Sequence, residues 1–299
     1  MLIEQKLEQI KLSSSQNAAM NFILEKRQFI ESMTIKELAD ASYTSTGTII
    51  RLAKKLGYQG YEDFKQDYLK EIYYLDTHFI NIDPNYPFHK DDNIQKIASK
   101  ITTLACETSQ DTFALLEHDQ LQKAVWSLKN SNQIHLIAIS YCLLLGEIFK
   151  LDMARIGRTV NVCHINGEEL FIPATVQKGD CVIMISYSGQ IEKLCILAKL
   201  LKEKEITLIV ISSIGDNQLK SYADIQLFIS TREKLHSKIK GYANENSIKQ
   251  ILDILYSCYF ALDYDKNLEY RLEISKFGEQ GRNSTIEIMK EDEYKSSRR

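Results

Sequence analysis

The sequence lacks the proline and the excess charge that are typical of disordered chains. It has 3 prolines among 299 residues, 26% of its residues are charged and 44% are hydrophobic. Such a composition excludes an extended disordered protein, because enough apolar residues are present to form a core. At roughly 100 to 200 residues per domain, the length indicates two domains.

The sequence also lacks an excess of positive charge. Its 40 Asp and Glu residues outnumber its 37 Lys and Arg residues, which gives a formal net charge of -3. A protein that coats nucleic acid through its overall positive potential is therefore excluded. One small basic region that contacts DNA remains compatible with this balance.

Long hydrophobic runs are absent as well. The apolar runs at residues 134–139, 181–185 and 206–211 are much shorter than the ~18 residues of a membrane helix. The first residues lack the apolar core and cleavage site of a secretory signal. We therefore expect a cytoplasmic protein without membrane contact, in which these runs form buried strands.

The cysteines and histidines give no metal-binding pattern. No Cys-x-x-Cys pair occurs, and the six histidines are scattered. We assign neither a metal site nor a cofactor. We expect reduced core cysteines, namely Cys106, Cys142, Cys163, Cys181, Cys195 and Cys258.

The periodicity of the apolar residues divides the chain into four parts. Residues 1–75 have a helical pattern. Residues 76–92 are polar and contain Pro84 and Pro87, so we predict a linker there. Residues 93–280 form the predicted second domain, and residues 281–299 a polar tail.

The second domain begins with a helical pattern and then alternates between strands and helices. Its expected first core side chains are Ile97, Ile101, Leu104, Phe113, Leu116, Leu121 and Trp126. Strands are predicted at 133–140, 159–163, 180–186, 207–212 and 225–228, with helices at 142–156 and 192–203. A long helix then carries the stripe Ile248, Ile251, Leu252, Leu255, Tyr259 and Leu262, for which we prefer core packing, with contact of one part to a partner subunit as the alternative. The pattern predicts an α/β fold, a three-layer αβα sandwich with a parallel sheet, behind an all-α N-terminal domain.

Residues 34–57 have the pattern of a helix-turn-helix. Thr34 and Glu37 form a capping box for a first helix, and Ser45 caps a second. In the second helix the expected core side chains are Ile49, Leu52, Ala53 and Leu56, and those expected to point outward are Thr46, Thr48, Arg51, Lys54 and Lys55. The second helix of this motif fits the major groove of DNA.

The charge of this region favours DNA binding. Residues 41–61 contain three basic residues and no acidic one. Arg51 is suited to guanine, and Lys54 and Lys55 to phosphates. The predicted DNA-binding residues are Ser45, Thr46, Thr48, Arg51, Lys54 and Lys55. A solvated face of a small helical bundle would have the same periodicity, so the pattern alone leaves both interpretations open.

Residues 34–65 resemble the helix-turn-helix domain of the RpiR family of bacterial transcription regulators. The resemblance rests on Ile35, Glu37, Leu38, Ala39, Ser45, Thr48, Ile49, Ile50, Arg51, Lys55, Leu56, Gly57, Tyr58, Gly60, Tyr61, Phe64 and Lys65. The family usually has Gly where Tyr43 stands, in the turn between the helices. If that turn needs a positive φ, Tyr43 adopts it at a cost or the turn is reshaped.

A second candidate site follows the predicted strand at 180–185. Ser186, Ser188 and Gly189 lie between this strand and a helix, an arrangement that can bind an anion through hydroxyl and backbone N–H groups. Ligands of open α/β sheets bind at the carboxyl ends of the strands. An ordinary capped turn has the same residues, so this alternative stays open.

Residues 124–228 resemble a sugar isomerase (SIS) domain, which RpiR regulators carry behind the DNA-binding domain. The resemblance rests on residues 178–180, 185–189, 209–212 and 223–224. It implies an effector site for a sugar phosphate, with Ser186, Ser188, Gly189, Gln190, Ser140 and Tyr141 as candidates.

Two loops depart from the pattern of the SIS family. The usual Gly-x-Gly-Ser-Ser loop reads Ala-Ile-Ser-Tyr-Cys at 138–142, and Ile191 replaces a phosphate-facing Thr. We expect weaker phosphate binding, a different effector, or a degenerate sensor. Tyr141 would stack on a sugar ring or fill the site.

An SIS-type isomerase is the competing function. Glu192, His236 and Glu245 are the nearest candidates for its acid and base. An isomerase has no need of a helix-turn-helix, and a structural module would leave the basic face unexplained. We therefore predict a regulator without catalytic residues, acting as a homodimer or homotetramer on an inverted-repeat operator.

Overall fold

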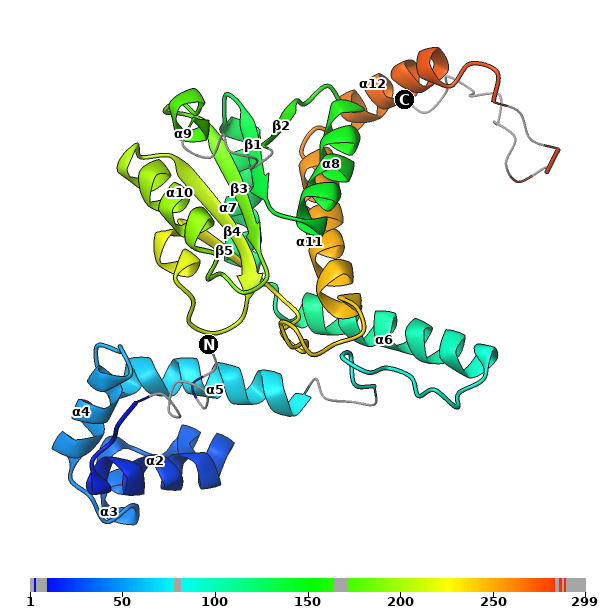
Figure 1. Ribbon diagram of the computed structural model, residues 1–299. Helices are drawn as coiled ribbons and strands as arrows, with labels where there is room; N and C mark the ends of the chain where they lie inside the picture. Colours follow the sequence, from blue (N-terminus) through cyan, green and yellow to red (C-terminus); the bar gives the residue numbers. More distant parts are fainter. Residues whose placement is uncertain are drawn as a thin grey trace.

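The protein consists of a helical part and an α/β part (Figure 1). The computed structural model describes residues 3, 10–77, 82–163, 171–282, 285, 286 and 288. Within these ranges, every helix is too short or too polar to cross a lipid bilayer.

The helical part comprises α2 (Ser14–Lys26), η1 (Arg27–Ser32), α3 (Ile35–Ala41), α4 (Thr46–Lys55) and α5 (Tyr61–Thr77). Its core combines side chains that repeat three or four positions apart in these helices. The largest fully buried ones include Met20, Ile23, Ile30, Leu38, Ile49, Leu52, Phe64, Tyr68 and Ile72. We call residues 10–77 the head.

Residues 82–92, which we call the connector, form no helix or strand and lead into α6 (Ile94–Ala114) and α7 (His118–Asn130). Of the core side chains predicted for α6 and α7, Leu104 is buried, and Ile97, Ile101, Leu116 and Leu121 are partly buried. The prediction is wrong for Phe113 and Trp126, which are 71% and 49% exposed. Helix α6 packs on α11, which leaves part of its apolar stripe uncovered, and Trp126 lies on the side of α7 away from the buried Ala124, Val125 and Leu128.

The α/β part, which we call the sensor, contains one parallel sheet in the order β2-β1-β3-β4-β5. The strands are β1 (Ile134–Ala138), β2 (Val160–Cys163), β3 (Cys181–Ser186), β4 (Thr207–Ser213) and β5 (Ile225–Ile229). In the register of β3 and β4, Ser186 pairs with Ser212. These two central strands therefore end in polar residues at one common edge.

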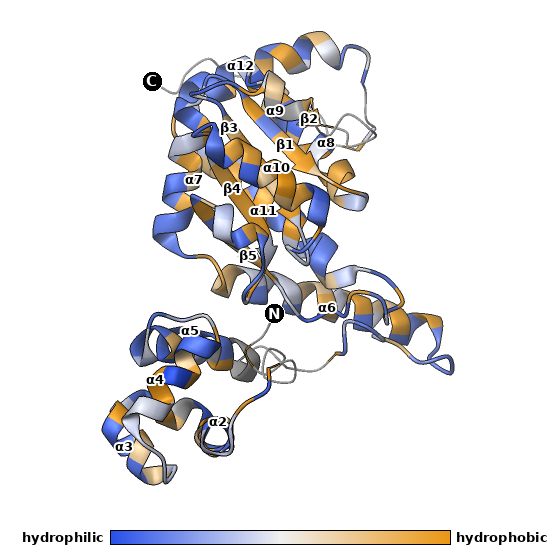
Figure 2. Cartoon of the chain, turned by 60° about the vertical axis from the view of Figure 1, so that its left-hand side comes forward, coloured by the Kyte–Doolittle hydropathy of each residue, from blue (hydrophilic) through white to orange (hydrophobic). Residues whose placement is uncertain are grey.

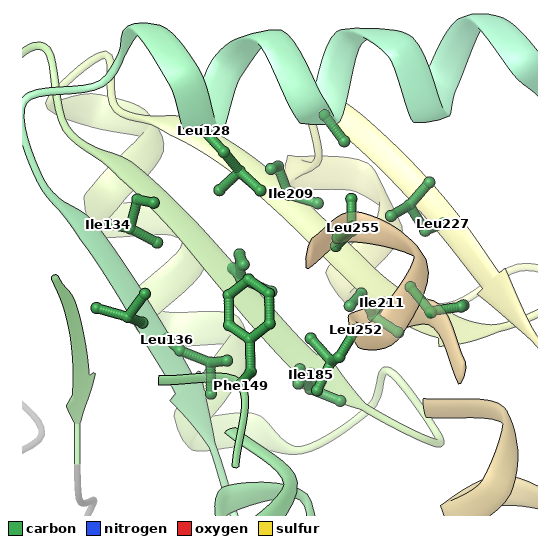
Figure 3. Close-up of a cluster of buried hydrophobic side chains, with 14 of the residues drawn as sticks. Leu128, Ile134, Leu136, Phe149, Ile185, Ile209, Ile211, Leu227, Leu252 and Leu255 are labelled. Atoms are coloured by element: carbon green, nitrogen blue, oxygen red, sulfur yellow. The ribbon is translucent and has the colours of Figure 1, made fainter. Parts of the chain in front are cut away.

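Helices cover both faces of this sheet (Figure 1), which confirms the predicted three-layer αβα sandwich. Ile183 and Ile185 face α7, α8 (Tyr141–Ala154) and α11 (Tyr242–Ala261), as Figure 3 shows for the labelled cluster around Phe149. Val182 and Met184 face α10 (Glu192–Glu203) and η2 (Leu219–Tyr222), beside the short α9 (Ile172–Thr175). Alternate residues of one strand thus enter opposite cores. Figure 2 shows hydrophobic strands between helices with hydrophilic outer faces.

The stripe on α11 packs into the core as predicted, with Ile248, Ile251, Leu252 and Leu255 buried. A further helix, α12 (Tyr264–Gly278), follows it and was not predicted separately. The cysteines are free thiols, but Cys106 is exposed on α6, so the prediction of core cysteines is wrong there.

Candidate functional site

The two helices of the helix-turn-helix begin with the predicted caps. The Thr34 hydroxyl accepts a hydrogen bond from Glu37 N, and the Glu37 carboxylate accepts one from Thr34 N at 2.8 Å. The hydrogen bonds that the Glu37 carboxylate accepts from Thr34 N and from the Thr34 hydroxyl lower the pKa of Glu37. Ser45 Oγ accepts from Thr48 N at 3.2 Å. The caps satisfy N–H groups that a helix leaves free in its first turn.

Helix α4 presents polar and basic side chains on its outer face. Thr46, Arg51, Lys54 and Lys55 are exposed, while Ile49, Leu52 and Ala53 are buried. For these seven residues the division between outer and core side chains is the predicted one. The exposed basic side chains can reach phosphates or base edges in a groove.

Thr48 does not point away from the head as predicted, because only 6% of it is exposed. It lies one turn before the buried Leu52, on the same side of α4. Its hydroxyl contacts Ser45 Oγ at 2.9 Å and accepts a hydrogen bond from Arg51 Nη2 at 3.3 Å. Thr48 therefore bonds the side chain of Arg51 and exposes little surface of its own.

Lys55 has a contact that the sequence did not predict. Its ammonium donates to the backbone oxygen of Lys11, in the segment before α2. This bond ties the end of α4 to the start of the described head. Lys54 lacks such a bond among the described residues and is the freer of the two lysines.

The turn between α3 and α4 keeps a positive φ at Tyr43. Its φ is 54°, and 98% of the residue is exposed. The turn closes through a 2.9 Å hydrogen bond from Thr44 N to Ala39 O. The turn is therefore not reshaped, and Tyr43 adopts a conformation that costs a non-glycine residue free energy.

The serines after β3 use their hydroxyls within their own loop. Ser186 Oγ accepts from Gly189 N at 3.2 Å, and Ser188 Oγ accepts from Gln190 N at 3.2 Å. Ser186 is buried, Ser188 is half-buried and Gln190 is exposed. In this structure the two hydroxyls stabilise the loop, as in the alternative of an ordinary capped turn.

Gly189 allows a close approach, but the neighbour is a side chain of the protein. Its φ is 62°, and a Cβ added there would overlap the side chain of Asn217. Asn217 is buried and donates to Ser212 Oγ at 3.2 Å. Sequence reasoning missed Asn217, because its loop follows a different strand.

In the loop after β1, Ser140 has a positive φ, a conformation that favours glycine. Ser140 has φ 59° and ψ -137°, and it precedes α8 without a side-chain cap. Tyr141 is half-buried against the core cluster of α8 and α11, and burial raises its pKa. Packing of this kind agrees with Tyr141 filling space beside the site.

A buried polar cluster that the sequence did not reveal lies beside the serine loop. Tyr187 Oη donates to Glu233 O at 2.6 Å and accepts from Glu233 N at 3.1 Å. Lys238 Nζ lies 2.9 Å from Glu233 Oε2 and 5.2 Å from the centre of the Tyr187 ring. The Glu233 carboxylate also accepts from Ala243 N, at the start of α11. Burial raises the pKa of Tyr187, which keeps its hydroxyl a donor.

The candidates for isomerase chemistry do not form such a cluster. Glu245 is paired with Lys240 at 2.7 Å, whereas Glu192 and His236 are exposed. Within the described part of the chain, no hydrogen bond joins any two of the three residues. The geometry thus does not pair these three residues with one another as an acid and a base.

Two family profiles match the chain. Residues 1–73 match the helix-turn-helix domain of the rpiR family, and residues 127–261 match the SIS domain. The chain belongs to the RpiR family of transcription regulators.

Similar proteins are named as HTH-type transcriptional regulators. One, from Caldanaerobacter subterraneus, is 25% identical over 249 residues, which cover 83% of this chain and 86% of the relative. Another, from Bacillus subtilis, is 24% identical over 266 residues, which cover 87% and 90%. Both alignments span head and sensor together.

Solved structures share the fold of this RpiR-family chain. The Vibrio vulnificus NanR protein complexed with ManNAc-6P has a TM-score of 0.58 and 19% identity, over 92% of this chain and 96% of that one. The sugar isomerase domain of an RpiR transcription factor from Sphaerobacter thermophilus has a TM-score of 0.54 and 12% identity, over 61% and 99%. At these identities the likeness concerns the fold.

Proposed function

We propose that this RpiR-family regulator binds an operator through α4 and controls genes of carbohydrate metabolism. The observation that carries this proposal is the outer face of α4. Arg51 and Lys54 are exposed there, on a helix that Ser45 caps and whose inner side chains are buried. Arg51 would hydrogen-bond a base edge, and Lys54 and Lys55 would contact phosphates. We assign residues 1–75 to DNA binding, 76–92 to the linker and 93–280 to the sensor.

We further infer that the sensor binds a sugar phosphate at the carboxyl edge of its sheet. Support comes from the SIS profile and from the shared fold of NanR, whose structure contains ManNAc-6P. The ligand would contact residues 186–190 and the loop at 140–141, and it would change operator affinity by favouring one arrangement of the protein. This role needs no reaction, and Glu245 is instead paired with Lys240.

A regulator with a degenerate sensor is the second candidate. It is favoured by a specific observation: the hydroxyls of Ser186 and Ser188 already accept hydrogen bonds from their own loop. A phosphate at this site would have to compete for the same N–H groups. The two candidates share the DNA-binding function and differ only in the ligand.

Selection from a random double-stranded DNA library tests the DNA-binding function. We expect the full-length chain to enrich an inverted repeat, because one short helix reads too few bases and a symmetric homodimer or homotetramer doubles the contact. Affinity should fall steeply with salt, since phosphate contacts release counterions. The proposal would be contradicted if no sequence were enriched, or if the protein bound unrelated DNA as tightly as the selected sequence.

Thermal unfolding with a panel of sugar phosphates tests the sensor. A ligand at about 100 times its dissociation constant stabilises the folded protein by roughly 2.7 kcal/mol. We expect at least one hexose or hexosamine phosphate to raise Tm, while its unphosphorylated sugar does not. If every compound leaves Tm unchanged, the degenerate sensor is the better description.

A further inference from the structure

The connector is bonded to the sensor at Asn85. Asn85 Oδ1 accepts from Lys234 N at 2.7 Å, and its backbone oxygen accepts from Ile239 N at 2.9 Å. Its amide nitrogen donates to Asp83 Oδ1 at 2.8 Å and to Arg232 O at 3.5 Å. Only 7% of Asn85 is exposed. One buried residue thus holds both ends of the loop 232–239.

The opposite side of the same loop is bonded to the candidate effector site. Tyr187 lies between Ser186 and Ser188, and its hydroxyl bonds both the N–H and the carbonyl of Glu233. The next N–H along the chain, that of Lys234, donates to Asn85. Two neighbouring peptide groups therefore connect the effector loop with the connector.

Arg232 makes a second bond from this loop to the connector. Its Nη2 donates to Ile82 O at 2.9 Å and lies 3.3 Å from Glu107 Oε2 of α6. The Arg232 side chain is only 2% exposed. Helix α5 of the head ends at Thr77, so the end of the head lies at most about 17 Å from Ile82 at the full reach of the chain. The loop fixes the positions of Ile82 and Asn85, and these positions limit where the head can lie.

We propose that Asn85 and Tyr187 couple the effector loop to the head through the loop 232–239. This inference rests on the proposed function, because it describes how occupancy of the sensor would reach the DNA-binding helices. A ligand that moves Tyr187 would move the backbone of Glu233 and Lys234, and with it the connector. The coupling is carried by a continuous series of hydrogen bonds between groups that are buried or half-buried, where such bonds are costly to break singly.

Hydrogen exchange of the full-length protein, without ligand or DNA, tests this coupling. The substitution Tyr187→Phe removes only the hydroxyl. We expect peptides covering 232–239 and also 82–92 to exchange roughly fivefold faster, the factor for one hydrogen bond of about 1 kcal/mol. The matched control is Tyr256→Phe on α11, whose ring contacts Phe260 in the same domain.

The reciprocal variant Asn85→Ala should speed exchange in 232–239 and in 186–190. In the double variant with Tyr187→Phe, the fold-increase in the exchange rate should be smaller than the product of the two separate fold-increases, since both residues act on one loop. Faster exchange in 232–239 with unchanged exchange in 82–92 would overturn the proposal. So would equal effects of Tyr256→Phe, or unchanged exchange in both variants. Since neither a sugar phosphate nor an operator is used, a failure here is separate from a failure of the proposed function.

Discussion

The head and the sensor each contain a short turn in which serine hydroxyls cap backbone N–H groups. In the head, Ser45 caps α4, and the basic side chains that we propose contact DNA lie outside the cap on the exposed face. In the sensor, Ser186 and Ser188 bond the loop itself, and they are also the groups expected to contact the ligand. In the head, Arg51 and Lys54, which we propose contact DNA, take no part in the cap, whereas in the sensor the two capping serines are themselves the proposed ligand contacts.

The two domains also differ in the space around their glycines. Gly57, which follows α4, has a positive φ and nothing within 4 Å of an added Cβ. Gly189 also has a positive φ, but Asn217 occupies the place of a Cβ. Gly57 is therefore needed only for its positive φ, whereas Gly189 is needed both for its positive φ and for the close packing of Asn217.

The largest expected effect is a difference in unfolding free energy between alanine variants of these two glycines. Gly189→Ala combines a strained φ with an overlap, so we expect the sensor to lose about 3 kcal/mol of unfolding free energy. Gly57→Ala adds only the strained φ and should cost the head about 1 kcal/mol. Chemical denaturation of both variants measures the difference. Equal losses would show that the contact with Asn217 is unimportant, and Asn217→Ala should partly rescue Gly189→Ala.

The next effect concerns the exposed face of α4. Arg51→Ala should weaken binding to the selected operator by about 1 to 3 kcal/mol and relax the preference at one base pair. The control is Arg155→Ala, an arginine of the sensor that lies 3.2 Å from Asp152. Gel-shift titrations against a library of operator variants measure both. An unchanged base preference in Arg51→Ala would refute a base contact.

A third effect tests two residues that stand where the resembling families usually have glycine, Tyr43 in the head and Ser140 in the sensor. Both keep a positive φ. Replacing either by Gly should stabilise its domain by roughly 1 kcal/mol through relief of strain, less the added entropy of the unfolded chain. Ser140 should gain more, because its ψ of -137° lies close to a region used almost only by glycine. Urea denaturation measures both changes, and a loss of stability in either variant would mean that the side chain makes a compensating contact.

The smallest effect compares the serine caps directly. Ser186→Ala removes the acceptor for the buried Gly189 N–H and should cost the sensor about 1 kcal/mol. Ser45→Ala removes an N-cap and should cost the head about 1 kcal/mol. Ser188→Ala should cost less, because Ser188 is half-buried and water can replace it. Thermal unfolding gives the order, and a larger loss for Ser188→Ala than for Ser186→Ala would contradict it.

Much of the fold was predictable because its signals are local. The predicted helix at 192–203 agrees in both bounds with α10, and the apolar runs became β1, β3 and β4. The caps at Thr34 and Ser45 involve residues three positions apart. Phe113 and Trp126 were misplaced because burial depends on which neighbouring element covers a helix face, and periodicity does not contain that information.

The sequence by itself determined the helical and α/β parts, their family, the exposure of Thr46, Arg51, Lys54 and Lys55 on α4, and the unusual residues at positions 43 and 140. Propensity, capping and alternation act over a few residues, so they can be read along the chain. Only the tertiary structure decided that Thr48 holds Arg51, that Asn217 fills the space at Gly189, and that Asn85 and Tyr187 hold one loop. In the last two cases the partners are 28 to 149 positions apart, and their hydrogen bonds and contacts exist only once the sheet has brought the loops together at one edge.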